Sequence, residues 1–315
     1  MADKKIIAVI GATGAQGGGL VRATLADRLG PFAVRAITRK PDSEKARALA
    51  ALGVEVVAGD ANDPSSLRAA FSGAHGVYCV TNFWEHLDPE RELAQATAMA
   101  RAAKAAGVAH VIWSTLEDTR SSIPLGDPRL PTLKGKYKVP HFDAKGEADA
   151  VFAKESAPTT FLNAAFYWEN FIFFGMGPRT VNGQLVLALP LGGGKLPGIA
   201  AEDIGRCAYG VFRRGPEMAG KRVGVAGEIL SGAEMAAGFA RALGRSVSFH
   251  DMPFDQYRAL GFPGADDLGN MFQYQALFND AFCRSRDVAL SRALNPALQS
   301  FAEWLRQSGA RVPVA

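Results

Sequence analysis

The sequence has few cysteines and no long apolar run. Its three cysteines, Cys79, Cys207 and Cys283, lie far apart and form no CxxC pair, which argues against a disulfide framework and a zinc site. We therefore predict no metal centre and a reducing, cytoplasmic location. No stretch reaches the roughly 18 apolar residues that a membrane span needs, so we expect no membrane partner.

The sequence also lacks a strong excess of charge of one sign. The 315 residues carry a formal net charge of +4, and the basic residues alternate with acids, as in KPDSEKAR and LDPERELA. A nucleic-acid-binding face needs clustered basic residues, so we predict no direct nucleic-acid partner. The composition, 48% hydrophobic with 34 glycines, is typical of a globular protein with one large domain or two unequal ones.

Short β-branched runs alternate with alanine-rich helical segments over the first half of the chain. Near-continuous apolar strands separated by helices indicate a parallel sheet that is covered on both faces. The expected strands span residues 4–10, 32–38, 54–59, 76–81, 110–115 and 159–165. We therefore predict the α/β class, with a doubly wound parallel sheet of the Rossmann type.

The regular alternation loosens after residue 165. The later segments are an aromatic cluster, FYWENFIFF, a strand at 184–191, a helix at 201–214 and a C-terminal helix at 298–309. We predict a cofactor-binding domain over residues 1–165 and a smaller α+β domain for a substrate or partner over residues 166–315, with the chain returning to the sheet. A proline-rich stretch, 121–140, is expected to form a long loop.

A glycine-rich loop follows the first predicted strand. Gly11, Gly14 and Gly17 stand in IIAVIGATGAQGGGL, between that strand and a predicted helix. Glycines allow a tight turn here, and they allow a pyrophosphate to approach the helix N-terminus closely. The strand, the turn and the helix together predict a dinucleotide site.

The end of the second predicted strand indicates which dinucleotide binds. An acidic residue there would bond the adenosine ribose of NAD, but ITRKPD has Arg39 and Lys40 and no acid before Asp42. Two cations favour the 2′-phosphate of NADP. The residues after the third and fourth strands, which would face the adenine and the rest of the cofactor, are Asp60, Ala61, Thr81, Asn82 and Phe83.

These motifs resemble the NmrA-like family of atypical short-chain dehydrogenases. The matching stretches GATGAQGG, VTNFWE, HFDAKGE, FYWENF, LGFPGADDLGNMF and LNPALQSFAEWL extend over almost the whole chain. The resemblance implies an NADP(H)-binding domain with a smaller C-terminal domain. The cofactor contacts that it implies are Gly11, Ala12, Thr13, Gly14, Ala15, Gln16, Arg39, Lys40, Asp60, Ala61, Thr81, Asn82, Phe83, Lys145, Tyr167, Trp168, Glu169 and Asn170.

A histidine stands where ordinary short-chain dehydrogenases carry a catalytic tyrosine. In their YxxxK helix the tyrosine donates a proton and the lysine binds the nicotinamide ribose. Here the pair is His141 and Lys145, which share one helix face. A histidine can transfer a proton, although beside a lysine ammonium we expect mainly the neutral imidazole; simple packing at the helix start is the alternative. Tyr167, in the aromatic cluster, is a second candidate donor.

Three functions fit these features. The first is an NADP(H) sensor or regulator, because the cofactor contacts are present without the tyrosine and some members of the resembled family sense the NADP(H) ratio. The alternative is an NADPH-dependent oxidoreductase of quinones or enones, since a good acceptor needs little help from a phenolic acid. The last is a cofactor-free scaffold, which the glycine loop argues against. The expected partners are NADPH and either a regulatory protein or a small quinone-like substrate, and a homodimer stays open.

Overall fold

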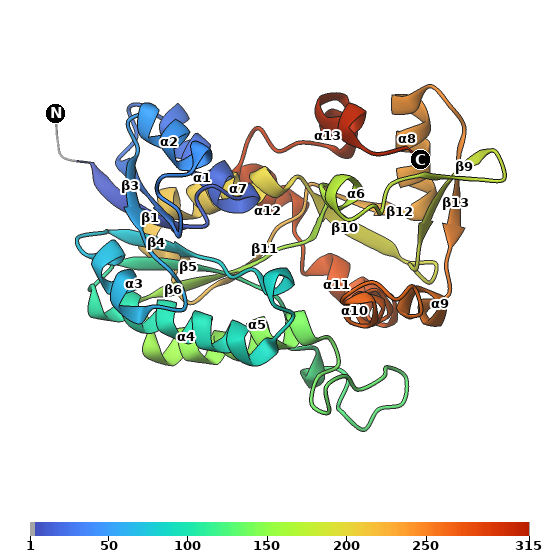
Figure 1. Ribbon diagram of the computed structural model, residues 1–315, viewed down its shortest axis with the longest axis horizontal. Helices are drawn as coiled ribbons and strands as arrows, with labels where there is room; N and C mark the ends of the chain where they lie inside the picture. Colours follow the sequence, from blue (N-terminus) through green and yellow to red (C-terminus); the bar gives the residue numbers. More distant parts are fainter. Residues whose placement is uncertain (1–3, 315) are drawn as a thin grey trace.

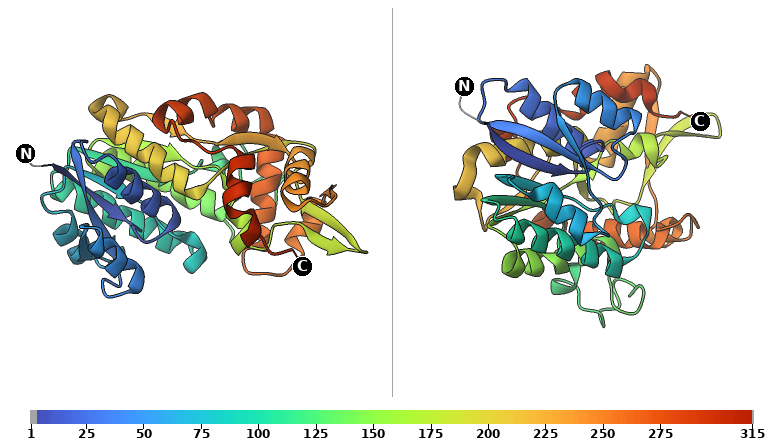
Figure 2. Two further views of the ribbon diagram at one scale, coloured as in Figure 1. Left: turned by 90° about the horizontal axis from the view of Figure 1, so that it is seen from above. Right: turned by 60° about the vertical axis from the view of Figure 1, so that its left-hand side comes forward.

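The computed structural model describes residues 4–314, which form two parts along the long axis of the molecule (Figures 1 and 2). The N-terminal part is built on a seven-stranded parallel sheet with the order β11-β6-β5-β4-β1-β2-β3. Its strands are β1 (Lys5–Ile10), β2 (Phe32–Thr38), β3 (Glu55–Ala58), β4 (Gly76–Cys79), β5 (His110–Thr115), β6 (Thr159–Asn163) and β11 (Arg222–Gly224). The predicted α/β fold with a doubly wound parallel sheet is confirmed.

Helices cover both faces of this sheet (Figure 1). One face carries α1 (Ala15–Ala26), α2 (Glu44–Ala51), α7 (Ala201–Arg214) and α12 (Val288–Leu294), and the other carries α3 (Pro64–Phe71), α4 (Pro89–Ala105) and α5 (Pro140–Glu155). Successive strand residues point to opposite faces, so Ile7 packs with Leu20 and Ile204, whereas Ala8 packs with Met99. Among the residues that the structure describes, no helix is long and apolar enough to cross a membrane.

Several predicted elements have the bounds expected from the sequence. β2, β5 and α7 span the residues predicted for them, while β4 and β6 end two residues early. After β4 the chain leaves the sheet, and Thr81 and Asn82 follow at the sheet edge, where they line a cavity. The chain also returns to the sheet, because β11 pairs with β6 and α7 packs against α1; the division at residue 165 stays a prediction.

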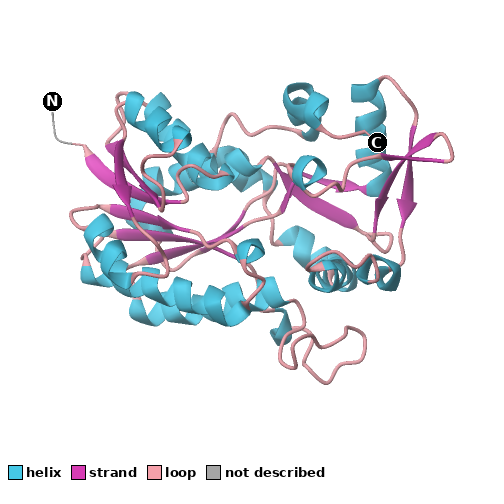
Figure 3. Cartoon of the chain, viewed as in Figure 1, coloured by secondary structure: helices cyan, strands magenta, loops and turns pink. Residues whose placement is uncertain are grey.

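The C-terminal part contains two small sheets (Figure 3). One has the order β12-β10-β7 and the other β13-β9-β8, and each combines a parallel with an antiparallel pair. Their strands are β7 (Phe166–Tyr167), β8 (Arg179–Val181), β9 (Gln184–Leu189), β10 (Lys195–Ile199), β12 (Glu228–Ser231) and β13 (Val247–Asp251). The helices are α6 (Asn170–Phe173), α8 (Gly232–Leu243), α9 (Phe254–Arg258), α10 (Ala265–Leu277), α11 (Asn279–Arg284) and α13 (Phe301–Ser308).

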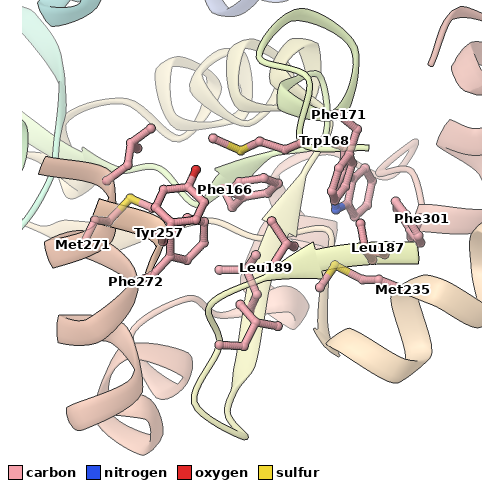
Figure 4. Packing of buried hydrophobic residues seen from close by; sticks show 14 of the residues in the cluster. Phe166, Trp168, Phe171, Leu187, Leu189, Met235, Tyr257, Met271, Phe272 and Phe301 are labelled. Carbon is pink, nitrogen blue, oxygen red and sulfur yellow. The ribbon is translucent and has the colours of Figure 1, made fainter. Parts of the chain in front are cut away.

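The aromatic cluster supplies much of the core of the C-terminal part (Figure 4). The Phe171 ring meets the Phe239 ring edge-on, with centroids 5.1 Å apart, and the Trp168 and Phe301 rings lie 5.4 Å apart. Such aromatic contacts stabilise a core beyond the area that they bury. Phe174 of the same cluster stays exposed, so the cluster serves both the core and the surface.

The predicted loop 121–140 is an irregular segment that follows a short turn, η2 (Thr119–Ser121), and leads into α5 (Figure 3). The buried Lys138 ammonium donates to the carbonyl oxygen of Asp127 at 2.8 Å, and Asn270 of α10 donates to the carbonyl oxygen of Lys138 at 2.6 Å. Asp143 of α5 accepts the backbone N–H of Lys138 at 2.7 Å. These bonds fix the chain immediately before the helix that carries His141 and Lys145.

Candidate functional site

A cavity of about 920 Å³ lies at the carboxyl ends of the parallel strands and extends to the C-terminal part. Its lining includes Ile10 at the end of β1, Thr38 of β2, Thr115 of β5, and Leu268 and Met271 of α10. Doubly wound sheets bind ligands at this edge. The volume lies in the range of about 300–1,000 Å³ that is common for small-molecule sites.

The cavity collects most of the residues that the sequence predicted for a cofactor. They are Gly11, Thr13, Gly14, Ala15, Gln16, Gly17, Arg39, Asp60, Ala61, Thr81, Asn82, Phe83, Lys145, Tyr167 and Asn170. His141 lines the same cavity. These residues meet because the carboxyl ends of neighbouring parallel strands share one edge of the sheet.

The predicted residues that do not line the cavity are Ala12, Lys40, Trp168 and Glu169. Trp168 packs against Phe301, and the Glu169 carboxylate accepts the backbone N–H of Ala201 at 2.8 Å. These contacts engage both side chains away from the cavity, and the cofactor contacts implied for them stay predictions. Lys40 is exposed, and its role at a 2′-phosphate stays a prediction.

The glycine loop fits a pyrophosphate. Gly11 has a φ of 66°, which favours glycine, and a Cβ added to Gly17 would lie 2.4 Å from the carbonyl oxygen of Gly11. Gly14 precedes α1 and makes no side-chain cap, so the first backbone N–H groups of the helix remain free for an anion. A dinucleotide such as NADP(H) therefore fits the residues present.

A short 3₁₀ turn after β4, η1 (Phe83–Glu85), contacts both ends of the cavity. At one end, Glu85 pairs with Arg39 across 2.5 Å between Oε1 and Nη1. This hydrogen bond raises the pKa of the Arg39 guanidinium and holds the pKa of the Glu85 carboxyl below its usual value. At the other end, the Trp84 ring lies 4.8 Å from the His141 ring, centroid to centroid.

Lys145 is paired with a buried carboxylate that no sequence pattern identified. Its Nζ lies 2.8 Å from Oε1 of Glu92, and it donates to the Thr81 hydroxyl at 2.6 Å. Glu92 stands in α4 and is fully buried, and Nε2 of His86 lies 3.5 Å from its second oxygen. The Lys145 ammonium is therefore neutralised and fixed at the cavity wall.

His141 is held by a second carboxylate that sequence reasoning missed. Asp267 of α10 accepts from His141 Nδ1 at 2.6 Å and from the His141 backbone N–H at 3.1 Å. A carboxylate only accepts, so Nδ1 carries a proton; within residues 4–314, Nε2 has no hydrogen-bond partner. The sequence predicts a mainly neutral ring beside the Lys145 ammonium, and this stays a prediction. In the structure Asp267 contacts the ring, while Glu92 pairs with Lys145.

Gln16, which lines the cavity, connects three hydroxyl groups. Its amide nitrogen donates to the Tyr167 hydroxyl, and its oxygen accepts from the hydroxyls of Tyr78 and Ser114. Burial raises the pKa of Tyr167 to about 12. Tyr167 therefore faces the cavity as a protonated phenol and as a weaker acid than an imidazolium at neutral pH.

The end of the cavity beside His141 is largely apolar. The side chains that form it are Trp84, Phe142, Phe173, Phe174, Leu268, Met271 and Phe282. The rings of Trp84 and Phe174 lie 6.2 Å apart, centroid to centroid. Flat aromatic walls of this kind suit a planar, apolar ligand.

The three cysteines lie outside this cavity. Cys79 and Cys207 are buried, and burial raises the pKa of both thiols. Cys283 is partly exposed. Across the described part of the chain, no group of three or more His, Cys, Asp or Glu residues could hold a metal ion.

Comparisons with known proteins agree with this geometry. The sequence profile of the NmrA-like family matches residues 3–305. The NmrA-like family domain-containing oxidoreductase lnbB of Aspergillus flavus is 29% identical over 292 residues, which are 87% of this chain and 84% of that protein. The NAD(P)H azoreductase of Xenophilus azovorans is 32% identical over 274 residues, which are 85% of this chain and 86% of that protein. The crystal structure of NmrA, a negative transcriptional regulator, in complex with NADP has a TM-score of 0.75 and 25% identity, covering 96% of this chain and 95% of that one.

Proposed function

Because the chain belongs to the NmrA-like family, we propose that it is an NADPH-dependent oxidoreductase that reduces a small, planar, largely apolar acceptor of the quinone or enone type. This is the second of the functions that the sequence left open. The names of two relatives, an oxidoreductase and an azoreductase, favour it over the sensor role. The observation that carries the proposal is the position of His141, held by Asp267 at the apolar end of the cavity.

We expect the cofactor to lie along the sheet edge. The glycine loop would hold its pyrophosphate, Arg39 its 2′-phosphate and Lys145 its nicotinamide ribose. The NADP complex of NmrA supports this cofactor class. When bound, NADPH would supply a hydride to the acceptor.

The apolar walls would orient the acceptor and exclude water from it. Trp84 and Phe174 flank the cavity beside His141. A planar acceptor that stacks against one of these rings gains apolar contact area. The pocket supplies few polar groups, so acceptors that need many hydrogen bonds are expected to bind poorly.

His141 would supply the proton that accompanies the hydride. Asp267 fixes the ring through Nδ1, so Nε2 is the atom that can donate towards the acceptor. The Asp267 carboxylate stays hydrogen-bonded to Nδ1, so the ring is held in place while Nε2 donates. After the transfer the ring keeps its Nδ1 proton and regains the Nε2 proton from solvent. Tyr167, with a pKa of about 12, is the less suitable donor at neutral pH.

An acceptor screen tests the proposal. Purified protein is mixed with NADPH and a panel of quinones, enones and azo dyes, and the loss of NADPH absorbance is followed. We expect turnover with at least one planar acceptor, and a fall in kcat of about 100-fold for His141→Gln. NADPH that binds but is oxidised by no acceptor in the panel would count against an enzymatic role.

The second candidate is the NADP(H) sensor or regulator, which the sequence favoured. It is supported by the structural likeness to NmrA, a named transcriptional regulator, and by His141 in place of the YxxxK tyrosine. The sequence motifs also resemble one NADPH-sensing family member, NmrA-like family domain-containing protein 1, and this resemblance favours the sensor role. It predicts tight NADPH binding without turnover, so the same screen separates the two. The glycine loop argues against the third candidate, a cofactor-free scaffold.

A further inference from the structure

No acidic residue directly follows β2 in the sequence, but the carboxylate of Glu85, from the turn η1, lies beside the end of this strand. NAD-binding folds place an acidic residue at this strand end, where it bonds the adenosine ribose. Here the strand is followed by Arg39, yet Glu85 of η1 reaches Arg39 to within 2.5 Å. Glu85 and Arg39 both line the cavity, so a cation and an anion stand together where the ribose of a bound dinucleotide is expected.

The pair is exposed enough to rearrange. The side chains of Arg39 and Glu85 are 54% and 42% exposed. An exposed ion pair contributes little stability, so Arg39 can exchange Glu85 for another anion. Glu85 is ionised at neutral pH, and the hydrogen bond from Arg39 holds the pKa of its carboxyl below the usual value. Asp60, a second acid on the cavity wall, also lies near enough to stabilise the Arg39 charge.

We propose that Glu85 is a specificity-determining residue that lets this site accept NADH as well as NADPH. With NADH, Glu85 accepts hydrogen bonds from the adenosine ribose hydroxyls while it stays paired with Arg39. With NADPH, Arg39 turns to the 2′-phosphate, and the Glu85 carboxylate opposes the phosphate charge. The inference rests on the cofactor site of the proposed function. It adds Glu85 as a determinant of the choice between NADH and NADPH, which Arg39 and Lys40 alone do not predict.

Replacing Glu85 should therefore change the two affinities in opposite directions. Glu85→Gln keeps the shape of the side chain and removes its charge. We expect the dissociation constant of NADPH to fall about fivefold and that of NADH to rise about fivefold, the scale of one exposed ion pair. Arg39→Gln is expected to weaken NADPH and to leave NADH within about twofold.

Equilibrium titrations followed by the fluorescence of NADPH and NADH measure these affinities without any turnover. The matched control is Glu55→Gln, because Glu55 forms an ion pair with Arg35 at 2.8 Å on the same sheet but outside the cavity. The control should leave both dissociation constants unchanged. Thermal unfolding of each variant verifies that it is folded.

The outcomes separate this inference from the proposed function. A Glu85→Gln protein in which both affinities stay the same, or move together, overturns the role of Glu85 while the oxidoreductase proposal stands. Opposite shifts support Glu85 even if no acceptor is reduced. A wild-type chain that binds neither cofactor overturns both the cofactor site and the inference built on it.

Discussion

Asp267 and His141 are 126 residues apart in the chain, yet Asp267 Oδ1 lies 2.6 Å from His141 Nδ1. The first is in α10 of the C-terminal part, and the second is in the first turn of α5, which packs on the parallel sheet. The candidate proton donor is therefore assembled from both parts. Its orientation depends on how they pack against each other.

Asp267→Asn is expected to slow acceptor reduction about tenfold or more while NADPH affinity changes less than about twofold. An amide stabilises a charged imidazole less well than a carboxylate does, but it preserves the packing. Steady-state kinetics separate kcat from KM. The neighbouring Asp266→Asn, at an exposed position, is the control. A proportional loss of NADPH binding would instead indicate a structural role for Asp267.

The dependence of the rate on pH should identify the donor. Burial raises the pKa of Tyr167 to about 12, so this phenol stays protonated and does not titrate between about pH 6 and 9. Tyr167→Phe is therefore expected to keep the shape of the pH–rate profile. His141→Gln, which removes the candidate donor, is expected to lower the rate about 100-fold at each pH in this range. A rate for Tyr167→Phe that falls as far as that of His141→Gln would assign the proton to the phenol.

Glu92 and Lys145 should depend on each other for stability. Glu92 is fully buried and the Lys145 side chain is 12% exposed, so removing one partner leaves an uncompensated charge. We expect Glu92→Gln to lower the free energy of unfolding by about 3 kcal/mol. The double variant Glu92→Gln with Lys145→Met should lose less free energy of unfolding than the two single variants lose together. Urea denaturation measures all three, and strictly additive losses would show that the pair is not coupled.

Gly17→Ala should disrupt the phosphate loop, because its Cβ would lie 2.4 Å from a backbone oxygen. The dissociation constant of NADPH is expected to rise at least about tenfold. Gly18→Ala is a matched control on the same helix, since its Cβ would meet the flexible end of Arg22 at 3.1 Å and the Ala12 carbonyl oxygen at an ordinary 3.5 Å. Equal effects of the two changes, measured by fluorescence titration, would refute a specific role for Gly17.

The sequence predicted the sheet and the cofactor edge because both depend on local patterns. Strands β2 and β5 are bounded runs of apolar and β-branched residues, and the glycine loop, Arg39 and Lys145 stand at strand ends or at helix spacing. The carboxylates Glu85, Glu92 and Asp267 were missed. Their partners lie on other elements, so only the packing of η1, α4 and α10 determines these pairs.

One partial signal was present for Asp267. It lies in LGFPGADDLGNMF, a stretch that also carries the family resemblance. Nothing in that stretch indicates that a carboxylate meets His141, because the contact requires α10 to cross the first turn of α5. The sequence also did not show which residues of the aromatic cluster enter the core and which face the cavity, because this too depends on packing. Trp168 is buried in the core and Tyr167 faces the cavity, although they are adjacent in the chain.

Single-turnover oxidation of bound NADPH by a quinone, compared between the wild-type chain and His141→Gln, tests the oxidoreductase function most directly. We predict rapid oxidation by the wild type, a rate about 100-fold lower for His141→Gln, and NADPH affinities that agree within about twofold. NADPH that binds tightly, yet is oxidised no faster on the wild-type protein than free in solution, would contradict the proposed function and favour the sensor role.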